Sequence, residues 1–177
     1  MTRIARLSLM PLALLCFAIT VPTSGALAQE KQRVAIKGLA ANTKYTQQQA
    51  IDVGDVPGHQ VRVYEFVRTF PADPPMVNGV KLKEAWTRGT SDYTDGTGPS
   101  IVYITYVFEN DDKIFVRGAV VTQNAGIGKL ASATAATITG GTGKFSAIQG
   151  LVRTSTSSDP KAGFNEGQSE MEYWFRK

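Results

Sequence analysis

Short runs rich in β-branched and aromatic residues alternate, from residue 59 to the C-terminus, with segments rich in glycine, asparagine, aspartate and proline. The clearest run covers residues 101–108 and ends at the turn-forming residues 110–112. Runs of this length and composition are typical of β-strands, and the glycine- and proline-rich segments mark the turns between them. No stretch in this part of the chain has a long amphipathic helical period. The sequence therefore predicts an all-β domain.

Seven runs fit strands. They cover residues 61–67, 80–90, 101–108, 113–122, 132–139, 146–156 and 168–176. Asp111 and Asp112 predict a tight antiparallel hairpin, and the glycines of residues 140–143 permit a second tight turn. Residues 45–52 fit a short helix and an edge strand equally well, so both interpretations stay open. Consecutive strands joined by short turns predict one antiparallel β-barrel or sandwich.

The N-terminal segment has the features of a signal peptide. Arg3 and Arg6 precede the apolar run 7–21, which is followed by a small-residue stretch that ends at Ala28. This order predicts export, to the periplasm or the medium, with cleavage after Ala28. The apolar run contains Pro11 and is shorter than the roughly 20 residues that a spanning helix needs, so we expect no stable membrane anchor.

Cys16, the single cysteine, lies within this segment. A lipid-anchor site needs a small residue directly before its cysteine, and Leu15 stands there, so we expect no lipidation. The mature chain then has no disulfide, and closure into a barrel is favoured over a sandwich because a closed barrel leaves no unpaired strand edge. The predicted organisation is a signal peptide (1–28), a flexible N-terminal lead-in (29–44) and a β-barrel domain (45–177).

Charge and the remaining reactive residues exclude several functions. The full chain has 19 basic and 15 acidic side chains, and removal of two arginines with the signal peptide leaves a net charge of about +2. No basic cluster indicates a nucleic acid partner. Without a thiol and with His59 as the only histidine, neither a thiol nucleophile nor a metal site with two histidines can form. We therefore predict no metal and no cofactor.

The segment 138–150, Ile-Thr-Gly-Gly-Thr-Gly-Lys-Phe-Ser-Ala-Ile-Gln-Gly, follows the hairpin strand 113–122. Its order of strand, glycine-rich turn, aromatic residue and glycine resembles the allene oxide cyclase and dirigent barrel-like group. The strand with Val63-Tyr64-Glu65 is similar to the first strand of the cyclases, and Tyr173-Trp174-Phe175 occupies the place of their closing strand. The resemblance covers about residues 60–176. It implies an eight-stranded antiparallel barrel that holds a small hydrophobic molecule and, in some members, guides its cyclisation or coupling.

The resemblance also implies a cavity role for Glu65, which matches the cavity glutamate of the cyclases. Their cavity asparagine is replaced here by Val67, their cavity cysteine has no counterpart in the mature chain, and their proline aligns loosely with Pro74 or Pro75. These departures put allene oxide cyclisation itself in doubt. The resembling families include dimers and trimers, so a homo-oligomer is an open alternative.

Glu65 is also a candidate from the strand pattern. Alternation places it on one face with Val61, Val63 and Val67, and burial among them would raise its pKa and suit a catalytic acid or base. The alternatives are that the opposite face, with Arg62 and Tyr64, points inward, or that Glu65 pairs with an arginine.

A second group shares one face of the run 80–90. Glu84, Trp86 and Arg88 are two residues apart, which places them together. Inside a barrel, Trp86 would bind an aromatic ligand and Arg88 would stabilise developing negative charge. On the outside they would form a solvated face with a cation–π contact, and the pattern does not decide between the two.

Arg117 and Arg153 lie within otherwise apolar or small-residue runs, where an arginine binds a carboxylate or phenolate ligand or extends from the barrel surface. Tyr103 has polar neighbours on its face of the strand, so it is the candidate ligand contact in the run 101–108. Three hypotheses follow. The first is an exported barrel that binds a small hydrophobic or aromatic molecule. The second is an isomerase or cyclase acting on such a molecule through Glu65 and Arg88, and the third is a filled barrel that acts through its outer surface.

Overall fold

The computed structural model describes residues 30–177, so the predicted signal peptide and its cleavage site lie outside the described residues. The ten strands are β1 (Gln32–Gly38), β2 (Thr43–Asp52), β3 (His59–Thr69), β4 (Met76–Val77), β5 (Val80–Thr94), β6 (Gly98–Phe108), β7 (Lys113–Asn124), β8 (Leu130–Gly141), β9 (Ile148–Asp159) and β10 (Phe164–Phe175). Two short 3-10 turns, η1 (Ala40–Asn42) and η2 (Gly143–Phe145), complete the fold. Within residues 30–177, no helix has the length and apolar character needed to cross a membrane.

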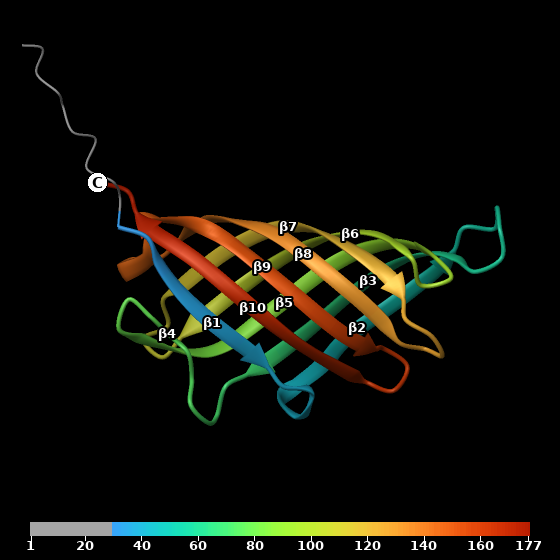
Figure 1. Cartoon of the computed structure of the whole chain (residues 1–177), viewed down its shortest axis with the longest axis horizontal. Helices are drawn as coiled ribbons and strands as arrows, with labels where there is room; N and C mark the ends of the chain where they lie inside the picture. Colours follow the sequence, from blue (N-terminus) through green and yellow to red (C-terminus); the bar gives the residue numbers. More distant parts are fainter. Residues whose placement is uncertain (1–29) are drawn as a thin grey trace, which may run out of the picture.

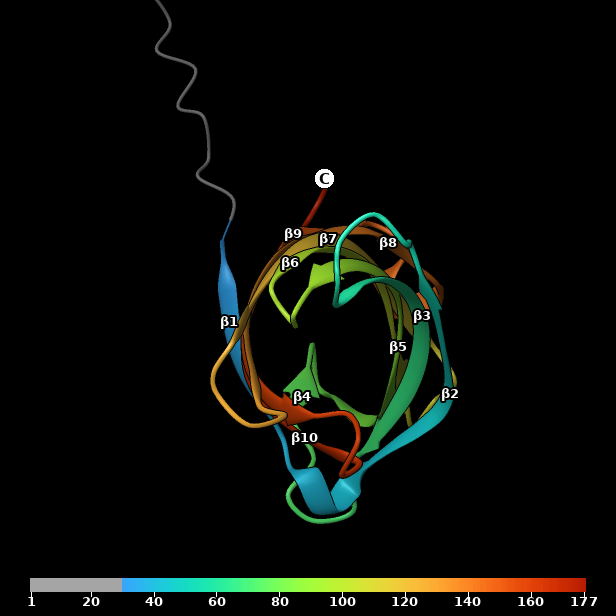
Figure 2. The ribbon, with the colours of Figure 1, turned by 90° about the vertical axis from the view of Figure 1, so that its right-hand side faces the viewer.

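Nine of these strands form one curled antiparallel sheet (Figure 1). Their order is β1-β10-β9-β8-β7-β6-β5-β3-β2, and β4 pairs only with β5. The view along the sheet shows that it curls around a central axis, with β4 lying behind the opening (Figure 2). The prediction of an antiparallel, barrel-like β fold is therefore confirmed.

The barrel differs from the expectation of full closure. In the described residues, β1 and β2 are the two edges of the sheet and do not pair with each other. Side chains bridge this seam instead: Asn165 of β10 donates to the Tyr45 hydroxyl of β2 at 2.8 Å and accepts from Arg68 of β3. The unpaired edges are thus covered by side chains and by η1, which joins the two edge strands.

In the N-terminal part, one expectation changes and one open alternative is decided. Residues 32–38, expected within a flexible lead-in, form β1 and pair along their whole length with β10. Arg33 of β1 and Lys31, which precedes the strand, form ion pairs with Glu172, and Ile36 faces the core. Residues 43–52 form edge strand β2 rather than a helix.

One half of the interior is a packed apolar core. Phe108 and Phe145 lie at its centre, both fully buried, with ring centroids 4.3 Å apart. The Asn78 amide beside β4 donates to the Tyr173 hydroxyl at 2.9 Å, which ties the β4 turn to this end of the barrel. The other apolar side chains of this core are Ile36, Phe70, Val77, Val80, Leu82, Ala85, Tyr106, Ile114, Val116, Ala136, Ile138, Ile148, Val152 and Met171.

Candidate functional site

A cavity of about 100 Å³ occupies the half of the interior that the apolar core leaves open. Its aromatic lining comes from β2, β3, β5, β6 and the residue after β3, and comprises Tyr45, Tyr64, Phe66, Phe70, Tyr93 and Tyr106. The opposite wall, on β8, β9 and β10, contributes the hydroxyls of Ser132, Thr134, Thr154, Thr156, Ser158 and Ser169. Rings on one side and small hydroxyl side chains on the other leave space for a flat molecule.

Aromatic packing shapes the cavity wall. Tyr64 stacks on Phe66, with ring centroids 6.3 Å apart and 5° between their planes. Gly89 lies opposite Tyr64 on β5, and a Cβ at Gly89 would come within 2.4 Å of the Tyr64 ring. The absence of a side chain at this position is therefore what lets the Tyr64 ring lie flat along the wall.

Three phenols of the cavity, those of Tyr45, Tyr64 and Tyr106, remain protonated at neutral pH. Burial raises the pKa of Tyr64, and it raises the pKa of Tyr106 to about 12 although the charge of Arg68 opposes the shift. Burial also raises the pKa of Tyr45, against the hydrogen bond from Asn165. These hydroxyls are therefore available as neutral hydrogen-bond donors and acceptors.

A chain of hydrogen-bonded hydroxyls supports one side of the cavity. The Tyr93 hydroxyl lies 2.8 Å from Ser100 Oγ and 2.7 Å from Thr122 Oγ1, and Thr122 lies 2.9 Å from Ser132. The Ser91 hydroxyl, which lines the same cavity, is buried and has no hydrogen-bond partner among the described residues. Buried hydroxyls are almost always satisfied, so Ser91 marks a place for a polar group of water or a ligand.

Two arginines are the charged residues of the lining, and no acidic residue accompanies them. Arg68 is largely buried. Its Nε donates to Thr43 Oγ1 at 3.3 Å, its Nη2 donates to Asn165, and its guanidinium lies 5.0 Å from the centre of the Phe66 ring. Arg62 is more exposed and donates to Gln48 Oε1 at 3.2 Å. Within residues 30–177 neither arginine forms an ion pair, so the cavity is electropositive.

All six residues predicted for the site lie on the outer face of the barrel. On β3 and β5 the inward residues are Tyr64, Phe66, Ala85 and Thr87, so their neighbours Glu65, Trp86 and Arg88 face outward. The inverted alternation, one of the interpretations left open above, is the one observed.

Glu65 is engaged in an external network. The Arg88 Nε lies 2.6 Å from Glu65 Oε2, and the Thr46 hydroxyl donates to Glu65 Oε1 at 2.6 Å. Arg88 also lies over the Trp86 ring, 5.4 Å from its centre. Neither Glu65 nor Arg88 lines the cavity, and the pairing of Glu65 with an arginine is the alternative that the sequence left open.

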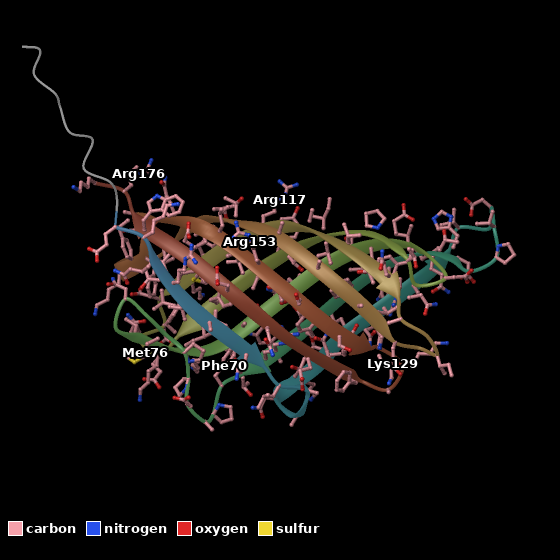
Figure 3. All side chains as sticks on the ribbon, viewed as in Figure 1. Phe70, Met76, Arg117, Lys129, Arg153 and Arg176 are labelled. Carbon is pink, nitrogen blue, oxygen red and sulfur yellow. The ribbon has the colours of Figure 1, made fainter. Side chains whose placement is uncertain are left out.

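Tyr103, Arg117 and Arg153 do not line the cavity either. Tyr103 is 52% exposed, and Arg117 lies 5.4 Å from the centre of its ring on the outer surface. Figure 3 shows Arg117 and Arg153 extending away from the barrel. The two arginines take the surface positions that were the alternative to ligand binding.

A β-bulge in β5 decides which face of this run points inward. Val80 and Leu82 face the core and alternate with exposed lysines, and this alternation continued along the chain would place Glu84, Trp86 and Arg88 inside. The pairing of β5 with β6 shifts register between Leu82 and Glu84. One extra residue reverses the faces of everything that follows. The small residues at 85, 87, 89 and 91 were the available sign of the inner face.

His59 connects the β2–β3 loop to β5 at the end of the barrel opposite β4 (Figure 1). Its Nε2 lies 2.6 Å from Asp92 Oδ1 and its Nδ1 lies 2.7 Å from Asp55 Oδ1. Hydrogen bonds to Asp92 and then Asp55 raise the pKa of His59 above its ordinary 6.5. The protonated ring donates to both carboxylates and holds the loop against the barrel.

We expect an NMR titration to give His59 a pKa above 6.5, and Asp92→Asn to bring it closer to that value. A pKa raised in the folded state means that this contribution to stability is complete below pH about 6.5 and is lost as the pH rises through the folded-state pKa. The hydrogen bond from His59 also lowers the pKa of Asp55, so the Asp55 contribution is lost as the pH falls through that lowered value. Asp111→Asn, on a remote turn, is the control, and a titration of His59 at or below 6.5 would contradict the assignment.

No family model matches the chain, and no curated protein matches its sequence. Among solved structures, one described as "Pyocyanin demethylase" is similar, with a TM-score of 0.39 and 14% sequence identity over 81% of this chain and 99% of that chain. A likeness this weak identifies neither a family nor a ligand. Membership of the allene oxide cyclase and dirigent group therefore stays a prediction.

Proposed function

We propose that the protein is an exported barrel that binds a small, largely aromatic molecule inside the polar half of its interior. The observation that carries this proposal is the cavity itself, which is walled by aromatic rings and hydroxyls although the other half of the same barrel is tightly packed. At about 100 Å³, the cavity is smaller than the roughly 150 Å³ cavity that is known to bind benzene, so a single aromatic ring is the largest group that it would enclose.

The lining favours binding over acid–base catalysis. The cavity has no carboxylate, imidazole or thiol among the residues described as its wall. Burial raises the pKa values of three of its phenols, those of Tyr45, Tyr64 and Tyr106, which makes them poor proton donors and acceptors near neutral pH. An isomerase acting through Glu65 has no support, since Glu65 lies outside. A fully filled barrel is disfavoured by the cavity.

The direct test is native mass spectrometry of the purified protein, followed by binding assays with benzyl alcohol and benzoate as one-ring probes. A co-purifying aromatic compound, or saturable binding of either probe, would support the proposal. An empty protein that binds neither probe would overturn it.

A matched pair of variants locates the binding. Thr134 faces the cavity and Ala135, its neighbour on β8, faces outward. Thr134→Phe places a ring in the cavity, and we expect it to abolish binding of both probes, measured by saturation-transfer NMR. Ala135→Phe adds the same ring to the outer face and should leave binding within about twofold of the wild type, a change below about 0.5 kcal/mol. Equal effects of the two variants would show that the probes bind elsewhere.

A further inference from the structure

Arg68 has more hydrogen-bond donors than the protein satisfies. A guanidinium carries five N–H donors, and among the described residues Arg68 uses two of them, on Thr43 and Asn165. Both acceptors are neutral, and no carboxylate of the described chain lies within ion-pair distance of Arg68. Its charge is thus buried without a counter-ion, which is costly unless something else neutralises it.

Two paired glycines make room for this guanidinium. Gly38 of β1 and Gly167 of β10 lie opposite each other in the sheet. A Cβ at Gly38 would come within 2.5 Å of the Arg68 side chain, and one at Gly167 would come within 3.2 Å of its Nη2. Arg68 therefore lies in a recess of the inner wall, close to the backbone, with its remaining donors free.

Tyr106 adds a further donor beside Arg68. Its side chain is buried and lines the same cavity, and its hydroxyl makes no hydrogen bond within residues 30–177. Arg68 lines the same cavity as Tyr106, and the charge of Arg68 lowers the pKa of Tyr106 against the effect of burial. The phenol is protonated at neutral pH, so it presents an O–H to the same region as the free guanidinium N–H groups.

We infer that the ligand of this cavity is an anion, an aromatic carboxylate whose carboxylate group is bound jointly by Arg68 and Tyr106. This inference rests on the proposed function and specifies its ligand class. Convergent donors without an acceptor call for an acceptor-rich group, and a carboxylate offers two oxygens that match a guanidinium. The ring of the ligand then lies against Phe66 and Tyr64, whose stacked planes form the adjacent wall.

The test compares benzoate with benzyl alcohol, a neutral compound of nearly the same size, by isothermal titration of the purified chain at neutral pH. We expect benzoate to bind at least about tenfold more tightly, the effect of a hydrogen bond to a charged group. Binding of both compounds with equal affinity would overturn the inference but leave the proposed function standing. Binding of neither would overturn the proposed function itself.

Variants identify the anion-binding groups. Tyr106→Phe preserves the packing and should weaken benzoate binding about three- to tenfold, while benzyl alcohol binding stays unchanged. Arg68→Met should weaken benzoate binding more than about tenfold. Arg117→Met removes a surface arginine and should change neither affinity. If Arg68→Met fails to fold, the wild-type comparison and Tyr106→Phe still decide the question, since unchanged benzoate binding in Tyr106→Phe together with no preference for benzoate contradicts the inference.

Discussion

Phe108→Ala is expected to lower the free energy of unfolding by about 3–5 kcal/mol, the usual cost of removing a fully buried phenylalanine ring. Phe108 is 0% exposed and packs on Phe145 at the centre of the apolar half of the barrel. Because the neighbouring strands are held by their ladders, the core cannot collapse to fill the space that the ring leaves. Equilibrium unfolding in guanidinium chloride, followed by tryptophan fluorescence, measures the change.

Phe115→Ala is the matched control for this variant. Phe115 lies on the outer face of β7 and is 37% exposed. Phe115→Ala should therefore lower the free energy of unfolding by well under half as much as Phe108→Ala does. Equal losses for the two variants would show that the apolar half does not carry the stability of the fold. Ligand binding should persist in Phe108→Ala below its unfolding transition, because Phe108 does not line the cavity.

Asn165→Leu is expected to lower the free energy of unfolding by about 2–4 kcal/mol. Asn165 is 3% exposed and joins three strands across the seam, accepting from Arg68 and donating to Tyr45. Leucine has a similar volume and makes neither bond. The loss combines a hydrogen bond to a charged group, worth about 1.5–3 kcal/mol, with a neutral one worth about 0.5–1.5 kcal/mol.

Gln168→Leu controls for the change of side-chain type on the same strand, since Gln168 is exposed. Gln168→Leu should change the free energy of unfolding by no more than about 0.5 kcal/mol. Hydrogen exchange gives an independent reading, because loss of the seam contacts should speed exchange in edge strand β2 more than in the central strands β7 and β8. A stability of Asn165→Leu equal to that of the control would show that the seam is not held by this side chain.

The two expected losses describe a divided interior. Apolar packing at the β4 end stabilises the barrel, which frees the other half from the need to be filled. Such a division permits an under-packed, electropositive cavity that would be costly in a domain of this size if the core were evenly distributed. The seam lies beside the cavity, so Arg68 and Asn165 link the closure of the barrel to the wall of the candidate site.

Much of the fold follows from local sequence. The β-branched and aromatic runs between residue 59 and the C-terminus became β3 and β5 to β10, and the turn at 110–112 lies where expected. The turn expected at 140–143 lies slightly later, because β8 continues to Gly141 and residues 142–147, with η2, join it to β9. Strand β1 was missed because Val34 and Ile36 are its only β-branched residues, too few to give a clear strand period. Its strand conformation comes from pairing with β10, which lies more than a hundred residues later.

The candidate site followed from sequence far less well. The face of a strand that points inward depends on register, and one bulge between Leu82 and Glu84 reversed it for Trp86 and Arg88. The apolar residues of a strand did not identify its inner face either. Val63 is 56% exposed on the outer face, while Tyr64 and Arg68 face the cavity.

By itself the sequence determined an all-β antiparallel domain with turns at defined places, because strand propensity and turn chemistry act over a few neighbouring residues. Only the tertiary structure decided which faces line the interior, where the cavity lies and which charges it contains. These properties arise because β3 lies close to β1 and β10 across the seam. Arg68 then lies between Gly38, Gly167 and Asn165, residues whose proximity no local pattern encodes.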